Sequence, residues 1–405
     1  MKNSNYDPIS ENAIEITKYS IKGELQNLLE FEDGTPVRCA EDWQKRREEV
    51  YRYAVELQYG KMPPAPKSVK VEPLYLGGNK KLSSYRVTCD TEGKAVCFIM
   101  YMFKADTREK APAVISGDLC FPYAFDKEYL DTFIENGINF VAFNRCELAP
   151  DIATYNFDSL YADSGENTLA REIYYRDIAN KNCGGQLKAA YPDYNFGAIG
   201  AWAWGYSRCV DALEILGNVD LSIISFTGHS RGGKTALLAG ALDTRAAIVN
   251  PNASCSGGCG SYKISIEAIN ENRERRKSEP LSNIHLNFPA WLGEEMESYI
   301  GREEDLPFDA HYIKAMVAPR VLFISEGAAD IHSNPVGNMQ TTEAVAEVYK
   351  LLKFEENLVW YFRHGDHGQK VEDIEQLVAV IDRQRYGYPL NDKFYRYPYK
   401  RPINI

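Results

Sequence analysis

Short apolar runs alternate with helix-like stretches along most of the chain. The runs most typical of strands cover residues 69–76, 84–88, 96–103, 113–115, 138–143, 221–226, 247–249, 321–324 and 358–362. Stretches with helical spacing cover residues 41–59, 127–136, 198–216, 234–242 and 341–352. The first three strand runs follow one another directly and predict antiparallel neighbours. The later alternation with helices predicts parallel strands, so the pattern favours an α/β fold with a mostly parallel central sheet flanked by helices.

Two long polar stretches interrupt this alternation, at residues 150–195 and 262–312. Irregular insertions of this length in a compact enzyme are usually lids or binding loops. The first helix ends at the segment GKMPPAPKS, because proline and glycine do not continue a helix. We therefore predict a single domain over residues 1–405, with an N-terminal helical extension over 1–65 and lid-like insertions at the two polar stretches.

The segment SIISFTGHSRGGKTALLAGAL, residues 222–242, places a serine in a distinctive setting. A β-branched apolar run leads into Gly228-His229-Ser230-Arg231-Gly232, and a helix-like run leads out. A G-x-S-x-G sequence between a strand and a helix is typical of a nucleophilic serine on a strained turn. The alternative is an ordinary serine in a glycine-rich turn. The helix that follows would offer N–H groups to a developing oxyanion, which favours the nucleophile.

A nucleophilic serine needs a base and an acid that orients the base. In an α/β-hydrolase these residues follow the serine in the order acid, then histidine, each on a loop after a strand. After the strand predicted at 321–324 the chain offers Glu326 and Asp330, and after that at 358–362 it offers His364 and His367. We prefer Asp330 and His367 because they lie deeper in their loops, where the side chains have room to meet.

The two cations that follow the serine are further candidates. Arg231 supplies the first N–H of the helix, and its guanidinium is a second possible oxyanion donor; the alternative is a surface arginine paired with a lid. Lys234 lies one helical turn after Ser230, where it can face the same cleft and suit a hydroxyl-rich or anionic substrate. Its alternative is a solvated helix lysine.

Charge and cysteine content narrow the class of protein. The 405 residues are 44% hydrophobic and 25% charged, with a net charge of -11, which disfavours nucleic acid and anionic membranes as partners. We find no apolar core of a signal peptide and no run long enough to span a membrane. Nine scattered cysteines fit free thiols, so we expect a cytoplasmic protein. We interpret Cys255 and Cys259 as thiols in a tight turn, not as half of a zinc site.

Three segments together resemble the glucuronoyl esterases and their bacterial esterase relatives. They are GAIGAWAWGYSRCVDALEIL, GHSRGGKTALLAGALDTRAAIVNP and LPFDAHYIKAMVAPRVLF, and the resemblance extends from about residue 40 to the C-terminus. It implies an α/β-hydrolase fold and a metal-independent serine esterase, without cofactor, that cleaves esters of glucuronic acid in xylan. It also implies that Ser230 is the nucleophile, that Arg231 helps to form the oxyanion hole, that Lys234 contacts sugar hydroxyls, and that His367 is the catalytic histidine.

The sequence departs from this family at several positions. Many members carry Pro-Gln-Glu-Ser, with the glutamate as catalytic acid, where this chain has Pro251-Asn252-Ala253-Ser254. Alanine cannot orient a histidine, and Asp330 matches the alternative acid of some bacterial members. The resemblance makes Asn252 a sugar contact in place of glutamine and His332 a replacement for a tryptophan, against the alternative of a solvated loop histidine. We also expect Trp291 to line the substrate pocket.

These residues leave several functions open. The first is a glucuronoyl esterase acting on a small-molecule or oligosaccharide ester. The second is an acetyl esterase of xylan or xylo-oligosaccharides with the same Ser230, His367 and Asp330. The third is a catalytically inactive carbohydrate-binding homologue, which the missing glutamate invites. The serine triad alone also allows a peptidase or a lipase, although Arg231 and Lys234 suit a polar substrate better.

Overall fold

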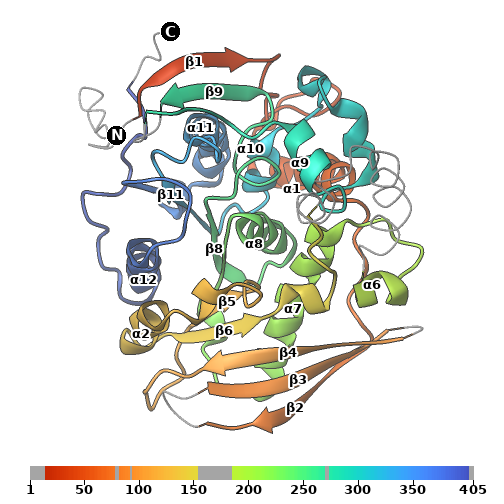
Figure 1. Cartoon of the computed structure of the whole chain (residues 1–405), viewed down its shortest axis with the longest axis vertical. Coiled ribbons are helices and arrows are strands. Elements are labelled where there is room, and N and C mark those ends of the chain that lie inside the picture. Colours follow the sequence, from red (N-terminus) through yellow and green to blue (C-terminus); the bar gives the residue numbers. More distant parts are fainter. Residues whose placement is uncertain (1–13, 78–81, 92–93, 154–184, 270–272, 401–405) are drawn as a thin grey trace, which may run out of the picture.

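A nine-stranded sheet forms the centre of the molecule (Figure 1). The computed structural model describes residues 14–77, 82–91, 94–153, 185–269 and 273–400. Strand order is β12-β11-β8-β7-β5-β6-β4-β3-β2, parallel from β6 to β12 and antiparallel from β6 through β4 and β3 to β2. The strands are β2 (Ser68–Tyr75), β3 (Leu82–Asp90), β4 (Ala95–Phe103), β5 (Ala113–Ser116), β6 (Asn139–Phe143), β7 (Ile224–His229), β8 (Ala246–Asn252), β11 (Val321–Gly327) and β12 (Leu358–Arg363). The predicted antiparallel start and parallel remainder are both confirmed.

Helices cover both faces of this sheet because its central strands are apolar on both sides. One face carries α2 (Lys127–Glu135) and α12 (Val371–Tyr386), which pack together. The other carries α7 (Ala198–Leu216), α8 (Arg231–Leu242), α10 (Ala310–Ala315) and α11 (Pro335–Leu352), with α1 (Ala40–Tyr51) against α10 (Figure 1). Along β11, Val321 and Phe323 enter the core under α12, whereas Leu322 and Ile324 enter the opposite core. The predicted α/β-hydrolase architecture is confirmed.

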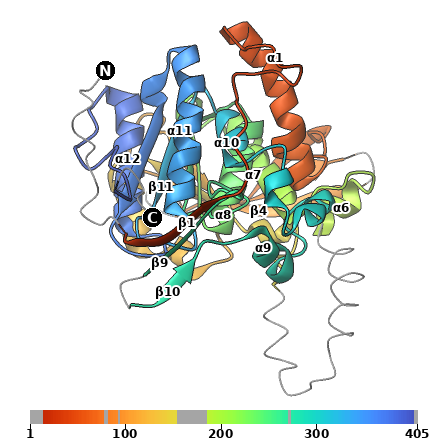
Figure 2. The same cartoon turned by 90° about the horizontal axis from the view of Figure 1, so that it is seen from above.

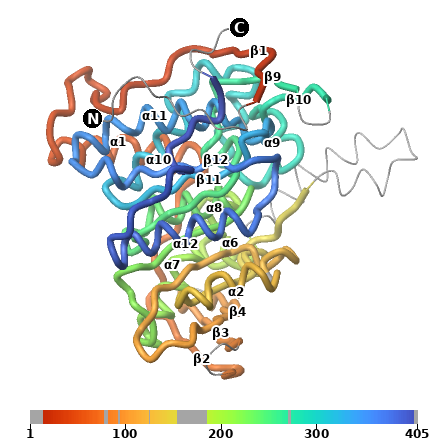
Figure 3. Tube along the Cα trace, turned by 90° about the vertical axis from the view of Figure 1, so that its left-hand side faces the viewer, coloured from red at the N-terminus to blue at the C-terminus, as the bar shows by residue number. Residues whose placement is uncertain are grey.

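A second, three-stranded antiparallel sheet joins the N-terminal region to the second polar stretch. β1 (Ile16–Ile21) pairs with β9 (Ile264–Ile269), which also pairs with β10 (Arg275–Lys277). Figure 3 shows β1 and β9 at the end of the molecule opposite to β2, β3 and β4. The predicted N-terminal helical extension therefore contains strand β1 in addition to its helix, and the stretch 262–312 contains regular elements that include β9 and β10. In β9 buried residues alternate with half-buried polar ones, a period-two pattern that the surrounding charges concealed.

Several boundaries also differ from the predicted ones. α1 passes into a π-helical segment, η1 (Arg52–Leu57), and α11 starts six residues before the predicted helix, at Pro335. Shorter elements are α6 (Gly185–Ala190), α9 (Leu281–Asn287) and the 3-10 turns η2 (Pro122–Phe125), η3 (Arg145–Glu147), η5 (Leu221–Ile223), η6 (Glu294–Tyr299), η7 (Glu303–Asp305) and η8 (Glu355–Asn357). Figure 2 shows α9 and α6 on the same side of the molecule.

Two further predictions concern the domain organisation and the first polar insertion. The single-domain organisation stays a prediction, and most of the predicted insertion at 150–195 lies outside the described residues. Across the parts of the chain that are described, no helix is both long and apolar enough to cross a membrane.

Substitution of Phe226 tests how much the hydrophobic core stabilises β7, the strand that precedes Ser230. Its ring is fully buried in β7, so Phe226→Ala should lower the free energy of unfolding by about 3–5 kcal/mol through lost apolar contact and the remaining cavity. Leu286→Ala, at a side chain that is 63% exposed on α9, is the control and should change stability little. Denaturant unfolding followed by circular dichroism measures both. Equal stability of the two variants would contradict this role of Phe226.

Candidate active site

Ser230 lies on a strained turn between β7 and α8. Its backbone has φ 57° and ψ −119°, a combination that residues other than glycine rarely adopt. The turn is possible because its two neighbouring glycines lack a side chain. A Cβ on Gly228 would overlap the carbonyl oxygen of Gly232, and a Cβ on Gly232 would overlap the carboxylate of Asp118. The G-x-S-x-G spacing is therefore required by packing in this fold.

The carboxylate of Asp118 holds this turn in place from the neighbouring strand. Its Oδ2 accepts hydrogen bonds from the backbone N–H of His229 and from the hydroxyl of Tyr123, both at 2.8 Å. Its Oδ1 forms an ion pair with Arg145, whose side chain is fully buried. Asp118 follows β5 and Arg145 follows β6, so one buried ion pair joins the ends of three adjacent strands.

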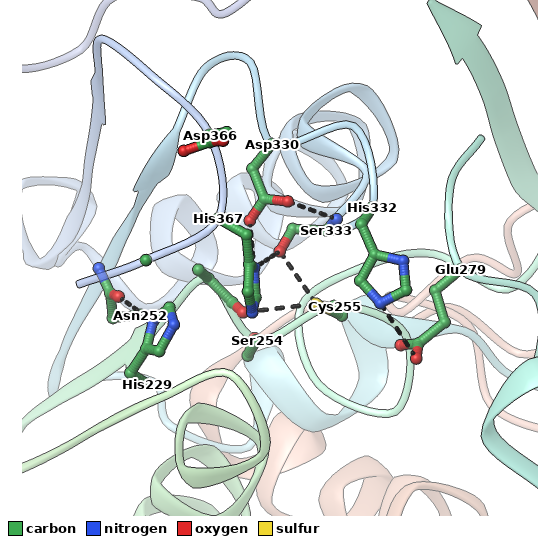
Figure 4. Close-up of polar contacts among 12 residues, drawn as sticks. His229, Asn252, Ser254, Cys255, Glu279, Asp330, His332, Ser333, Asp366 and His367 are labelled. Carbon is green, nitrogen blue, oxygen red and sulfur yellow. Dashed lines mark hydrogen bonds and ion pairs between the residues drawn. The ribbon is translucent and has the colours of Figure 1, made fainter. Parts of the chain in front are cut away.

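Asp330 and His367 meet on the loops that follow β11 and β12 (Figure 4). Asp330 Oδ2 lies 2.7 Å from His367 Nδ1, and Asp330 Oδ1 accepts a hydrogen bond from the backbone N–H of Ser333 at 3.1 Å. Burial raises the pKa of Asp330, but the hydrogen bonds from His367 and Ser333 outweigh burial and leave the pKa below its usual value. An ionised carboxylate at this place keeps the proton of neutral His367 on Nδ1, which leaves Nε2 as a base.

The alternative acid and histidine do not form this pair. Glu326 is fully buried within β11, where burial and the nearby Asp330 raise its pKa well above the usual value and keep it neutral. His364 lies at the exposed end of β12, one residue beyond the strand. The contact that orients an imidazole is therefore the one between Asp330 and His367.

The guanidinium of Arg231 is held between an acid and aromatic rings. Its Nη1 lies 3.2 and 3.1 Å from the two carboxylate oxygens of Asp151. Its central carbon lies 4.6 Å from the ring centre of Phe288 and 4.7 Å from that of Trp291, distances typical of cation–π contact. Trp291 is 2% exposed and donates from Nε1 to Asp151. Trp291 therefore supports the guanidinium of Arg231, and its expected place in the substrate pocket stays a prediction.

Lys234 is neither solvated nor open to the cleft. Its side chain is buried, and Nζ donates to the carbonyl oxygens of Ser254 at 2.8 Å and Ser256 at 2.6 Å. The third partner is Glu279, with Nζ 3.4 Å from Oε2. Because the ammonium has three protons and three protein partners, Lys234 orders the loop after β8 and fixes Glu279. The expected contact of Lys234 with sugar hydroxyls stays a prediction.

Asn252 also faces inward. Its amide nitrogen donates to the carbonyl and hydroxyl oxygens of Ser325, and its Oδ1 lies 2.7 Å from His229 Nδ1 (Figure 4). The amide nitrogen of Asn252 thus has its hydrogen-bond partners inside the sheet, and the expected sugar contact stays a prediction. Burial, together with the neighbouring His367, lowers the pKa of His229 to about 4, so the ring beside the nucleophile stays neutral.

His332 is the predicted pocket residue that remains open to solvent. Its side chain is 50% exposed, and Nε2 lies 3.4 Å from Oε1 of the buried Glu279. That hydrogen bond raises the pKa of His332. The ring centre of His332 is 6.1 Å from that of His367, so the two imidazoles border the same space (Figure 4).

Sequence reasoning missed the residues that position this site. They are Asp118, Arg145, Asp151 and Glu279. The first two could have been found, because both follow predicted strands and the carboxyl ends of parallel strands meet at one edge of the sheet. Asp151 and Glu279 lie in polar stretches without a periodic signal, so only the folded chain brings them to the serine.

Comparisons with known proteins point to one family. The model of the family described as "Glucuronyl esterase, fungi" matches residues 175–353. A 4-O-methyl-glucuronoyl methylesterase of Podospora anserina is 27% identical over 313 residues, which are 76% of this chain and 56% of that protein. Carbohydrate esterase MZ0003, from an unknown prokaryotic organism, is 26% identical over 433 residues, covering 95% of this chain and 92% of the other.

A solved structure gives the same result for the fold. The glucuronoyl esterase of carbohydrate esterase family 15 from Caldicellulosiruptor kristjansonii superposes with a TM-score of 0.71 at 26% identity, covering 94% of this chain and 95% of that one. The chain thus spans just over half of the length of the Podospora anserina relative and nearly all of the other two proteins.

Asp118→Asn should destabilise the protein strongly. The amide keeps the shape of the side chain but removes the nearer of the two carboxylates that pair with the buried Arg145, the other being Asp151 at 3.5 Å, and loss of one partner of a buried ion pair typically costs about 3–5 kcal/mol. Asp131→Asn is the matched control, because Asp131 pairs with Lys127 on the exposed surface of α2 and should matter little. Denaturant unfolding compares the two variants. A loss for Asp118→Asn no larger than that for Asp131→Asn would contradict the clamp.

His229 should make stability fall as the solution becomes acidic. Its folded-state pKa of about 4 lies below the usual 6.5, so the unfolded chain binds more protons between these values. Its contribution is complete above pH 6.5, and about 2 kcal/mol is lost between pH 7 and pH 5. His229→Gln removes the contribution of His229 to this loss of stability. His311, whose pKa is also lowered to about 4 by burial, is present in both proteins and contributes equally to each. Unfolding free energies at the two pH values test the difference; equal acid sensitivity would refute it.

Proposed function

We propose, from the premise that the chain belongs to the glucuronoyl esterase family, that it is a serine carboxylic ester hydrolase acting on 4-O-methyl-glucuronoyl esters of xylan. The observation that carries the proposal is the Asp330–His367 pair at the carboxyl edge of the sheet that also presents Ser230. That arrangement suits acyl transfer, and the names of the relatives in both comparisons supply the class of ester.

The proposed reaction follows the order of the groups in the site. Ser230 Oγ attacks the ester carbonyl while His367 Nε2 takes its proton, and Asp330 stabilises the imidazolium. In this proposal N–H groups at the start of α8 stabilise the oxyanion, and Arg231, which follows the serine, is a further candidate donor. His367 then gives the proton to the leaving alcohol, and the acyl group stays on Ser230. In the second half of the reaction His367 takes a proton from water, the water attacks the acyl carbonyl, and His367 returns the proton to Ser230.

Substrate selection, in this proposal, falls to the polar side of the site. His332 is half-exposed and tied to Glu279, so its imidazole offers a positioned donor to a hydroxyl or carboxyl group of a sugar. Glu279 stays ionised despite its burial, because Lys234 and His332 hold its pKa below the usual value. A wall of this kind suits a hydroxyl-rich uronate better than an apolar acyl chain.

Hydrolysis of benzyl glucuronate and 4-nitrophenyl acetate, measured side by side, tests the proposal. We expect cleavage of the glucuronate ester, with a loss of kcat of roughly 10⁶-fold in Ser230→Ala and roughly 10⁴-fold in Asp330→Asn. Glu326→Gln is the matched control for the acid, because Glu326 is already neutral, and it should leave the rate nearly unchanged.

The pattern of activities separates the alternatives. Serine-dependent cleavage of acetate alone would replace the proposal with an acetyl esterase. Activity on neither ester, in a folded protein, would favour a carbohydrate-binding homologue without catalysis. A larger loss of kcat in Glu326→Gln than in Asp330→Asn would still indicate an esterase but would assign the role of the acid to Glu326.

A further inference from the structure

Three potential metal ligands from distant parts of the chain converge beside the proposed triad (Figure 4). They are the thiol of Cys255, the carboxylate of Glu279 and the imidazole of His332, and their ligand atoms all lie within 4.8 Å of one another. Thiolate, carboxylate and imidazole are the groups that bind Zn²⁺ in proteins, commonly as three ligands plus a water molecule. The set was not visible in the sequence, because no second cysteine or histidine pair at zinc spacing accompanies Cys255 and Cys259.

The distances suit one small ion after a modest adjustment. Two ligands of one tetrahedral zinc ion lie about 3.5 Å apart, given metal–ligand bonds of about 2.0–2.3 Å. His332 Nε2 and Glu279 Oε1 already lie 3.4 Å apart. The thiol requires a shift of about an ångström, judged against the same bond lengths. The half-exposed side chain of His332 is free enough of packing to make that shift.

The backbone around the ligands is held firmly. The N–H of Glu279 donates to the carbonyl oxygen of His332 at 3.1 Å, so these two ligands are fixed relative to each other. The carbonyl oxygen of Cys255 accepts from the N–H groups of Gly258 and Gly260, which closes the turn that carries the thiol. Ligands on fixed backbone lose little entropy when an ion binds.

We propose that Cys255, Glu279 and His332 form a binding site for a soft divalent cation, with Zn²⁺ as the biological case, and that the bound ion blocks the esterase. Binding converts the thiol to a thiolate and releases its proton to the solvent, and water completes the coordination. The nearby ammonium of Lys234, 3.4 Å from Glu279, opposes a second positive charge. The site is therefore suited to reversible inhibition and not to a permanent structural ion.

Inhibition follows from the position of the site and rests on the proposed function. An ion on Glu279 and His332 takes the groups assigned above to the sugar, so it competes with the substrate. It also lies next to the base: Ser333 Oγ is 3.0 Å from Cys255 Sγ and 3.5 Å from His367 Nδ1. Zinc should therefore raise the apparent KM more than it lowers kcat.

Titration of the full-length protein with Co²⁺, followed by displacement with Zn²⁺, tests binding without using activity. We expect one equivalent of Co²⁺ to produce a thiolate-to-metal charge-transfer band that Zn²⁺ removes. Cys255→Ser should abolish the band, and His332→Asn should weaken metal binding by at least about tenfold. Cys259→Ser is the matched control, since Cys259 is a buried thiol in the same loop that is not part of the cluster.

Inhibition is then measured with the ester that the wild-type protein cleaves. Zn²⁺ should inhibit wild type and Cys259→Ser alike, chelation should restore activity, and His332→Asn should need at least about ten times more Zn²⁺.

Absence of the cobalt band, or a band that survives in Cys255→Ser, overturns the site. A normal band without inhibition overturns the blocking role. Absence of esterase activity in metal-free wild type counts against the proposed function alone, because the cobalt band still decides the site. His332→Asn changes a half-exposed side chain, so it keeps the test valid if Cys255→Ser fails to fold.

Discussion

The buried ion pair of Asp118 and Arg145 is the constraint on which the arrangement of the serine depends. The backbone of Ser230, with its positive φ, is strained, and such strain persists only where surrounding groups leave the backbone no alternative. Asp118 provides this by accepting the N–H of His229 while its other oxygen is fixed by Arg145. Removing Arg145 would take the paired cation from the buried Asp118, and removing Asp118 would leave Arg145 with the more distant carboxylate of Asp151. The reactive geometry is thus maintained by electrostatics at the strand ends as well as by the glycines of the turn.

A second set of buried polar contacts shapes the loop that follows β8. This loop carries Ala253, and the carboxylate that meets His367 comes from Asp330, on the loop after the neighbouring strand β11. The loop is instead tied down by Lys234, whose ammonium holds two of its carbonyl oxygens. Burying a lysine is costly unless each of its protons has a partner, and that condition is met here with the help of Glu279. The loop after β8 is therefore held in place by Lys234 and Glu279 without an acid of its own at position 253.

The central fold and the Asp330–His367 contact could be predicted, because both leave recognisable patterns in the sequence. Apolar runs report strands, and the rule that acid and histidine follow successive strands selected the correct loops. The direction of buried side chains carries no such signal. Lys234 and Asn252 were expected to face a substrate, but desolvation and hydrogen bonding inside the protein decide their orientation. Strand β9 was missed for a related reason, since its pairing with β1 is set by tertiary contact across more than two hundred residues.

The loop from Asp330 to Ser333 links the chemistry of the site to its binding surface. Within four residues it supplies the carboxylate that orients His367, the half-exposed imidazole of His332, and a hydroxyl that lies between His367 and the thiol of Cys255. The backbone N–H of Ser333 is itself bonded to Asp330, so displacement of the far end of the loop is felt at the acid. Any ligand that draws His332 toward Glu279 therefore acts on a segment that also sets the position of the base. The half-exposed imidazole of His332 and the Asp330–His367 contact are therefore mechanically linked through one loop.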